Sequence, residues 1–102
     1  MDINDEILAI LGVKMRRVDF AGVDRLIRRG FSFSSFTRAM KVLGISKEEL
    51  ARALGMKSET VRSVALRGSR LSLSESDRLY RIVRILALAT ELFRDRKTAA
   101  EW

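Results

Sequence analysis

Six glycines divide the chain into short segments, and no proline interrupts any of them. They recur every 8–14 residues, at Gly12, Gly22, Gly30, Gly44, Gly55 and Gly68. Between them apolar residues follow the spacing of an α-helix, and the alternation typical of strands is missing. A glycine directly after such a segment commonly ends a helix, because it adopts a positive φ without a Cβ clash. The chain is therefore predicted to be all-α, a compact helical bundle with short connections.

The glycines and the capping residues predict where the helices lie. We expect helices over residues 5–11, 20–29, 35–43, 47–54, 58–66 and 75–93, and a further short helix from about residue 97. The expected N-caps of four of them are Asn4, Ser34, Ser46 and Ser74. Ser46 and Glu49 have the spacing of a capping box, which makes the start at residue 47 the best defined of these boundaries.

Charge and composition limit the classes of function that the chain can have. The chain has 20 Lys and Arg against 13 Asp and Glu, and most of the excess lies between residues 21 and 70. Such a surface suits nucleic acid, an anionic membrane or an acidic protein, and charge alone does not choose among them. Without Cys, His, a P-loop or a GxGxxG motif, we expect no enzyme, no cofactor and no metal site. Without a signal peptide or an apolar run of about 20 residues, we expect a soluble cytoplasmic protein with no membrane partner.

Residues 47–66, KEELARALGMKSETVRSVAL, have the pattern of two helices joined by a tight turn at residues 55–57. This stretch resembles the helix-turn-helix of the Xre and phage-repressor families. That motif has apolar residues at its fourth, eighth, tenth, fifteenth and eighteenth positions, Ala at its fifth and Gly at its ninth. Started at Lys47, all seven positions match, on Leu50, Leu54, Met56, Val61, Val64, Ala51 and Gly55. The alternative is an ordinary corner of two helices, which keeps the fold without the DNA.

The helix-turn-helix resemblance implies a set of DNA-contacting residues. In this motif the second helix enters the major groove, and its N-terminal residues face the base edges. With Val61 and Val64 in the core, the outward face holds Lys57, Ser58, Glu59, Arg62 and Ser63. Arg62 suits a bidentate contact with guanine or a phosphate contact, and Glu59 suits the amino group of cytosine. The residues that follow the helix, Arg67 and Arg70, suit phosphate contacts. Taken singly, each could also be plain surface.

A second resemblance covers residues 20–102. The segment RLSLSESDRLYRIVRILALATELFRDRKTAAEW, residues 70–102, resembles the region that joins the helix-turn-helix to the toxin-binding domain of the MbcA/ParS/Xre antitoxins. The matching pieces are Leu71-Ser72, the run from Ser74 to Leu79, the apolar run to Ala89, Phe93, Asp95, Ala99 or Ala100, and Trp102. The resemblance implies a type II antitoxin that binds operator DNA, represses its own operon and neutralises a RES-domain toxin, an enzyme that consumes NAD.

The same resemblance predicts how the chain is divided. We expect a DNA-binding domain over residues 1–73 and, over residues 74–102, a long and largely apolar helix that opens the toxin-binding and dimerisation region. In the family the chain continues past the Trp into a segment with Pro and Gly, whereas this sequence stops at Trp102. We therefore expect an incomplete C-terminal domain, with only part of the toxin interface and poor toxin neutralisation.

The segment 75–93 has one narrow polar stripe, formed by Asp77, Arg81, Arg84 and Glu91. A helix on a single core needs an apolar arc of roughly 100° or somewhat more, and this arc is far wider. The helix is therefore expected to lie at the centre of a monomeric bundle, or to contact a second copy or a toxin, and we favour a homodimer. Three functions stay open: an antitoxin and autorepressor, a stand-alone Xre-class repressor, or a protein-interaction adaptor whose motif has lost DNA binding. DNA binding that falls steeply with salt separates the first two from the third.

Overall fold

The computed structural model describes residues 3–13 and 20–100, with side chains over residues 5–13 and 21–94. Within this part of the chain all regular structure is helical: α1 (Ile3–Ile10), α2 (Phe20–Arg29), α3 (Phe33–Leu43), α4 (Lys47–Ala53), α5 (Ser58–Arg67) and α6 (Leu73–Ala100). The predicted all-α fold is therefore confirmed. None of the described helices is long and apolar enough to cross a membrane.

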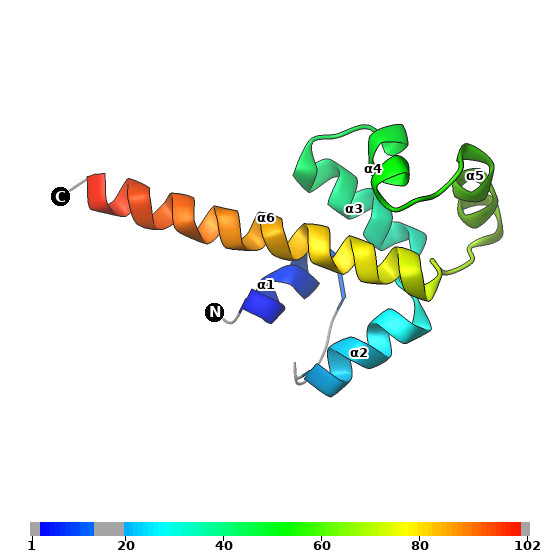
Figure 1. Cartoon of the computed structure of the whole chain (residues 1–102), viewed down its shortest axis with the longest axis horizontal. Helices are drawn as coiled ribbons and strands as arrows, with labels where there is room; N and C mark the ends of the chain where they lie inside the picture. Colours follow the sequence, from blue (N-terminus) through cyan, green and yellow to red (C-terminus); the bar gives the residue numbers. More distant parts are fainter. Residues whose placement is uncertain (1–2, 14–19, 101–102) are drawn as a thin grey trace.

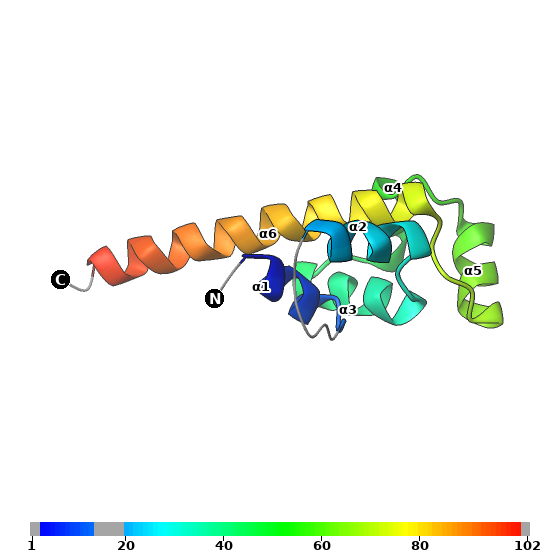
Figure 2. The ribbon, with the colours of Figure 1, turned by 90° about the horizontal axis from the view of Figure 1, so that it is seen from below.

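The helix α6 is the central element of the fold, and the other helices are arranged along it. In Figure 1 it runs from α5 at one end to the C-terminus at the other, with α3 and α4 on one side and α1 and α2 on the other. Leu79, Val83 and Ala87 are fully buried, and their spacing of four residues places them on one face of α6. Ile7 of α1 and Phe36 of α3 complete the centre of this core. Figure 2 shows α1 and α3 together on one side of α6.

Three of the predicted N-caps are wrong, and the starts of these helices lie earlier. The cap of α3 is Ser32 rather than Ser34, because Ser32 has the extended backbone of a cap and its hydroxyl accepts from the Ser35 amide. The start of α6 is fixed by Ser72 rather than Ser74: the Ser72 amide donates to Glu75 at 2.8 Å, and the Glu75 amide donates to the Ser72 hydroxyl at 3.1 Å. Asn4, the cap expected for α1, lies inside that helix.

The separate short helix expected from residue 97 does not form, because α6 continues without a break to Ala100. No glycine or proline lies between residues 73 and 100, so nothing in the backbone ends the helix earlier. The second half of α6 extends past α3 and α4 (Figure 1). Its outer face carries exposed apolar side chains: Ile85, Leu88, Leu92 and Phe93 are 42–68% exposed. We call these four residues the α6 stripe. The last two residues, Glu101 and Trp102, lie outside the described part of the chain.

The two ends of the segment that carries α3, α4 and α5 are held together by polar contacts, here called the clasp. The Leu71 amide donates to the Phe31 carbonyl, and the Phe31 amide donates to the Ser76 hydroxyl, both at 2.9 Å. The Arg70 guanidinium donates to the Gly30 carbonyl at 2.9 Å. Gly30 has φ +93°, and a Cβ there would collide with the Leu71 carbonyl, so no other residue fits. The clasp fixes the helix-turn-helix segment to the start of α6.

Candidate nucleic-acid interface

Two short helices and the turn between them form the candidate site. The predicted capping box begins α4: the Ser46 hydroxyl accepts from the Glu49 amide, and the Glu49 carboxylate accepts from the Ser46 amide. After Ala53 the chain reverses, and the Met56 amide donates to the Ala51 carbonyl at 2.8 Å. The second helix, α5, starts at Ser58 as predicted and ends at Arg67, and the next residue, Gly68, adopts the left-handed conformation and caps it. The expected helix–turn–helix order is therefore present in the structure.

The seven positions that define the motif have the environments that the motif requires. The apolar residues among them are all at most 8% exposed: Leu50, Ala51, Leu54, Met56, Val61 and Val64. Gly55 has φ +75°, a conformation that L side chains rarely adopt. These residues share one continuous core with α3 and α6, so α4 and α5 are packed as a unit against the rest of the bundle.

The turn is also held by α6. The Arg78 guanidinium donates to the Leu54 carbonyl at 3.1 Å. A Cβ added at Gly55 would meet the same guanidinium. Arg78 therefore covers the turn and satisfies a carbonyl at the C-terminal end of α4, which has no partner within the helix.

The residues predicted to face DNA lie at the surface. Lys57, Ser58, Glu59, Arg62, Arg67 and Arg70 are exposed, and Ser63 is half-buried. Within residues 5–13 and 21–94, no ion pair involves a side chain of α5. The charged groups of α5 therefore have no ionic partner in the described part of the protein that an incoming ligand would have to displace.

Two arginines occupy places that the sequence did not reveal. Arg70, assigned to phosphate from its position after α5, binds the Gly30 carbonyl in the clasp. Arg62 is exposed, yet it lies on the flank of α5 that faces α3 and α4, rather than at the centre of the outward face. There it lines an open groove of about 530 Å³, whose apolar floor includes Phe33, Phe36 and Val61.

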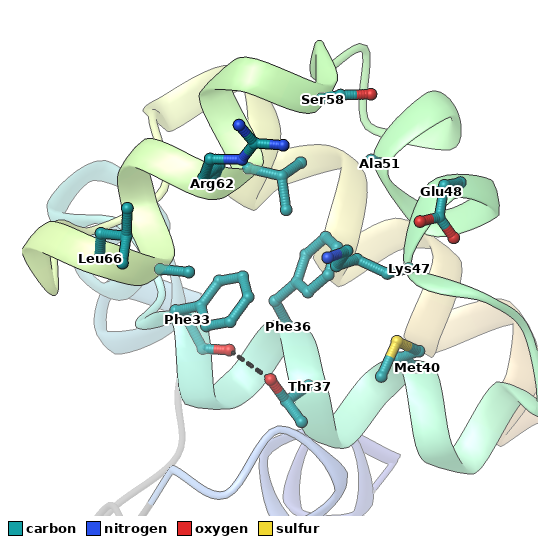
Figure 3. Close-up of a pocket in the computed structure, with 12 residues that line it drawn as sticks. Phe33, Phe36, Thr37, Met40, Lys47, Glu48, Ala51, Ser58, Arg62 and Leu66 are labelled. Atoms are coloured by element: carbon teal, nitrogen blue, oxygen red, sulfur yellow. Dashed lines mark hydrogen bonds between the residues drawn. The ribbon is translucent and has the colours of Figure 1, made fainter.

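Sequence reasoning also missed Lys47. It begins α4, and Figure 3 shows its side chain reaching across the groove from the wall opposite Arg62. The motif template starts at this residue but specifies no side chain there, so spacing gave no signal. The position of Lys47 beside the groove depends on how α4 packs beside α5.

Comparison with known proteins identifies a family for most of the chain. A family model described as an antitoxin Xre-like helix-turn-helix domain matches residues 22–84, more than half of the chain. This range runs from α2 to the middle of α6 and includes the whole helix-turn-helix and the clasp. No curated protein and no solved structure matches the chain.

Proposed function

The chain belongs to the antitoxin Xre-like helix-turn-helix family, and from this premise we propose that it binds double-stranded operator DNA through α4 and α5. The family is one of regulatory DNA-binding domains and not a class of enzymes. The observation that carries the proposal is the division of α5 into two faces. Val61 and Val64 are buried against the bundle, whereas Lys57, Glu59 and Arg62 are exposed and without ionic partners among the described residues.

We assign the contacts by the chemistry of each side chain. The N-terminal end of α5 enters the major groove, where Arg62 donates to guanine and Glu59 accepts from cytosine. Ser58 and Ser63 tolerate several bases. Lys57 and Arg67 contact phosphates, and Arg70 does so with the donors that its bond to Gly30 leaves free. A bidentate arginine–guanine contact carries about 1–3 kcal/mol of discrimination, so Arg62 dominates the specificity in this scheme.

The finer proposal concerns the antitoxin role. We propose that the chain represses its own operon as a homodimer and neutralises a NAD-consuming toxin of the RES type. The division at residue 73 then separates DNA binding from partner binding, and the α6 stripe is the surface for the second copy or the toxin. Its support is exposure: four large apolar side chains on consecutive turns of one helix form a patch of the kind that marks interaction sites.

The test is binding to the DNA upstream of the chain's own gene, measured by fluorescence polarisation against a scrambled duplex of equal length. Each phosphate contact lowers the slope of log K against log salt by about 0.9. With three phosphate contacts per copy, we expect a slope of about −5 for a dimer. Salt-independent or sequence-independent weak binding would favour the adaptor function. Operator binding without capture of a co-expressed RES toxin would favour the stand-alone repressor.

A further inference from the structure

The groove between α3, α4 and α5 has the size and lining of a small-molecule site. Its volume of about 530 Å³ lies within the range of about 300–1,000 Å³ typical of ligand pockets. Phe33 and Met40, both half-buried, form one wall, and Phe33 stacks on the fully buried Phe36 with ring centroids 5.2 Å apart. Leu66 of α5, 81% exposed at the rim, forms the other, whereas Val61 of the same helix is only 3% exposed. Such a lining favours a flat, apolar ligand body.

The polar groups of the groove favour a negative charge on that body. Lys47 and Arg62 extend over the space between α4 and α5 from opposite walls, while the Glu48 carboxylate lies to one side (Figure 3). Thr37 and Ser58 also line the groove, and the Thr37 hydroxyl already donates to the Phe33 carbonyl at 3.2 Å. Two cations against one anion leave a positive mouth above an apolar floor, which is complementary to an aromatic carboxylate.

We propose that this groove binds small aromatic carboxylates, with the ring between Phe33 and α5 and the carboxylate between Lys47 and Arg62. The proposal deepens the proposed function and rests on it in one respect: Arg62 serves both DNA and the ligand. A carboxylate paired with Arg62 withdraws that guanidinium from the base edge. The ligand therefore weakens operator binding, which makes the groove an effector site.

The first experiment uses 1-naphthoate as the probe, titrated into the whole chain and followed by ¹H–¹⁵N correlation NMR without DNA. A ligand of about 13 heavy atoms at ordinary efficiency binds with a dissociation constant of about 1 mM. We expect shifts in α3, α4 and α5. The neutral isostere 1-naphthamide, which needs no protein variant, should bind about tenfold more weakly. Equal binding of both probes, or no shifts up to about 10 mM, would overturn the proposal.

Two variants locate the site. Ala65 is exposed and lines the groove, so Ala65→Trp fills the groove without entering the core. It should lose naphthoate binding by at least tenfold, with its helical circular dichroism retained. The matched control Leu92→Gln removes a side chain of the α6 stripe, an exposed apolar surface that does not line the groove, and should bind naphthoate as the wild type does. Undiminished binding to Ala65→Trp, or binding lost in Leu92→Gln, would place the probe elsewhere and refute the assignment.

A final arm measures the coupling to DNA. Saturating naphthoate should weaken operator binding by about tenfold or more in the wild type, and should leave the affinity of Ala65→Trp for the operator unchanged. Naphthoate bound in the groove with no effect on the operator would overturn the effector role. Failure of all DNA binding would instead refute the proposed function, and the NMR titration would still decide whether the groove binds the anion.

Discussion

Replacing Gly55 has two energetic costs, backbone strain and the displacement of Arg78, and these two costs can be measured separately. Its φ of +75° makes any other residue strained, and the left-handed conformation costs an L residue about 1–2 kcal/mol. The Cβ of alanine would also meet the Arg78 guanidinium. That group is the far end of a flexible side chain, so it moves aside and loses its bond to the Leu54 carbonyl, at a cost of about 1 kcal/mol. We expect Gly55→Ala to lower the free energy of unfolding by about 2–3 kcal/mol.

Gly44→Ala is the matched control. Gly44 has a similar φ of +68°, but no atom lies within 4 Å of its added Cβ, so it should cost only the strain of about 1–2 kcal/mol. Urea unfolding followed by circular dichroism measures both variants. The decisive comparison is a double-mutant cycle: in an Arg78→Ala background, Gly55→Ala should cost about 1 kcal/mol less than in the wild type. Equal costs in the two backgrounds would refute the displacement of Arg78.

Three further predictions follow from other contacts. Arg62→Ala should weaken operator binding by about 1–3 kcal/mol and binding to random DNA by much less; an equal loss on both, in the same polarisation assay, would assign Arg62 to a phosphate. Ser76→Ala should lower the free energy of unfolding, measured with urea, by about 1–3 kcal/mol, because it leaves the buried Phe31 amide unpaired. The control Ser74→Ala, at an exposed position, should change the same free energy by less than about 0.5 kcal/mol. If the α6 stripe joins two copies, sedimentation at micromolar concentration should give a dimer for the wild type and an 11.6 kDa monomer for Leu92→Gln combined with Phe93→Gln; a wild-type monomer would contradict the homodimer.

The sequence predicted the structure best where neighbouring residues alone determine a helix end or a buried helix face. The helix predicted over residues 20–29 has those bounds, because Gly30 directly follows it, adopts φ +93° and ends the helix. The motif positions were predictable for a similar reason. Spacings of three and four residues place Leu50 with Leu54, and Val61 with Val64, on single helix faces, and those faces are buried.

Where two residues satisfy the same local rule, the sequence could not choose between them. Ser32 and Ser34 both offer a capping hydroxyl near the start of α3, and Ser72 and Ser74 do so near the start of α6. The choice depends on which residue the rest of the fold holds in an extended backbone. For α3, the buried Ser35 hydroxyl donates to the Leu11 carbonyl at 2.6 Å, a contact across 24 residues that fixes the first turn and leaves Ser32 as the cap.

The candidate site was predicted as a set of residues but not as a shape. Spacing along α5 placed Arg62 at the surface, yet the groove beside it depends on the aromatic residues of α3 and on Lys47 of α4. Arg70 was assigned to phosphate from its place in the chain, whereas its partner, Gly30, lies 40 residues away. Contacts of this range depend on the packing of whole helices, and no periodicity within one helix reports them.

The clasp makes the segment from Phe31 to Leu71 a closed loop whose two ends meet. The amide of one end residue binds the carbonyl of the other at 2.9 Å, so the two ends of the segment lie side by side. Segments with adjacent ends are the ones that proteins exchange, insert and permute with little disturbance to the host. Another helix-turn-helix grafted at residues 31 and 71 would need the same end geometry and also the same buried face, because Phe36, Leu50 and Leu54 share one core with α1 and α6.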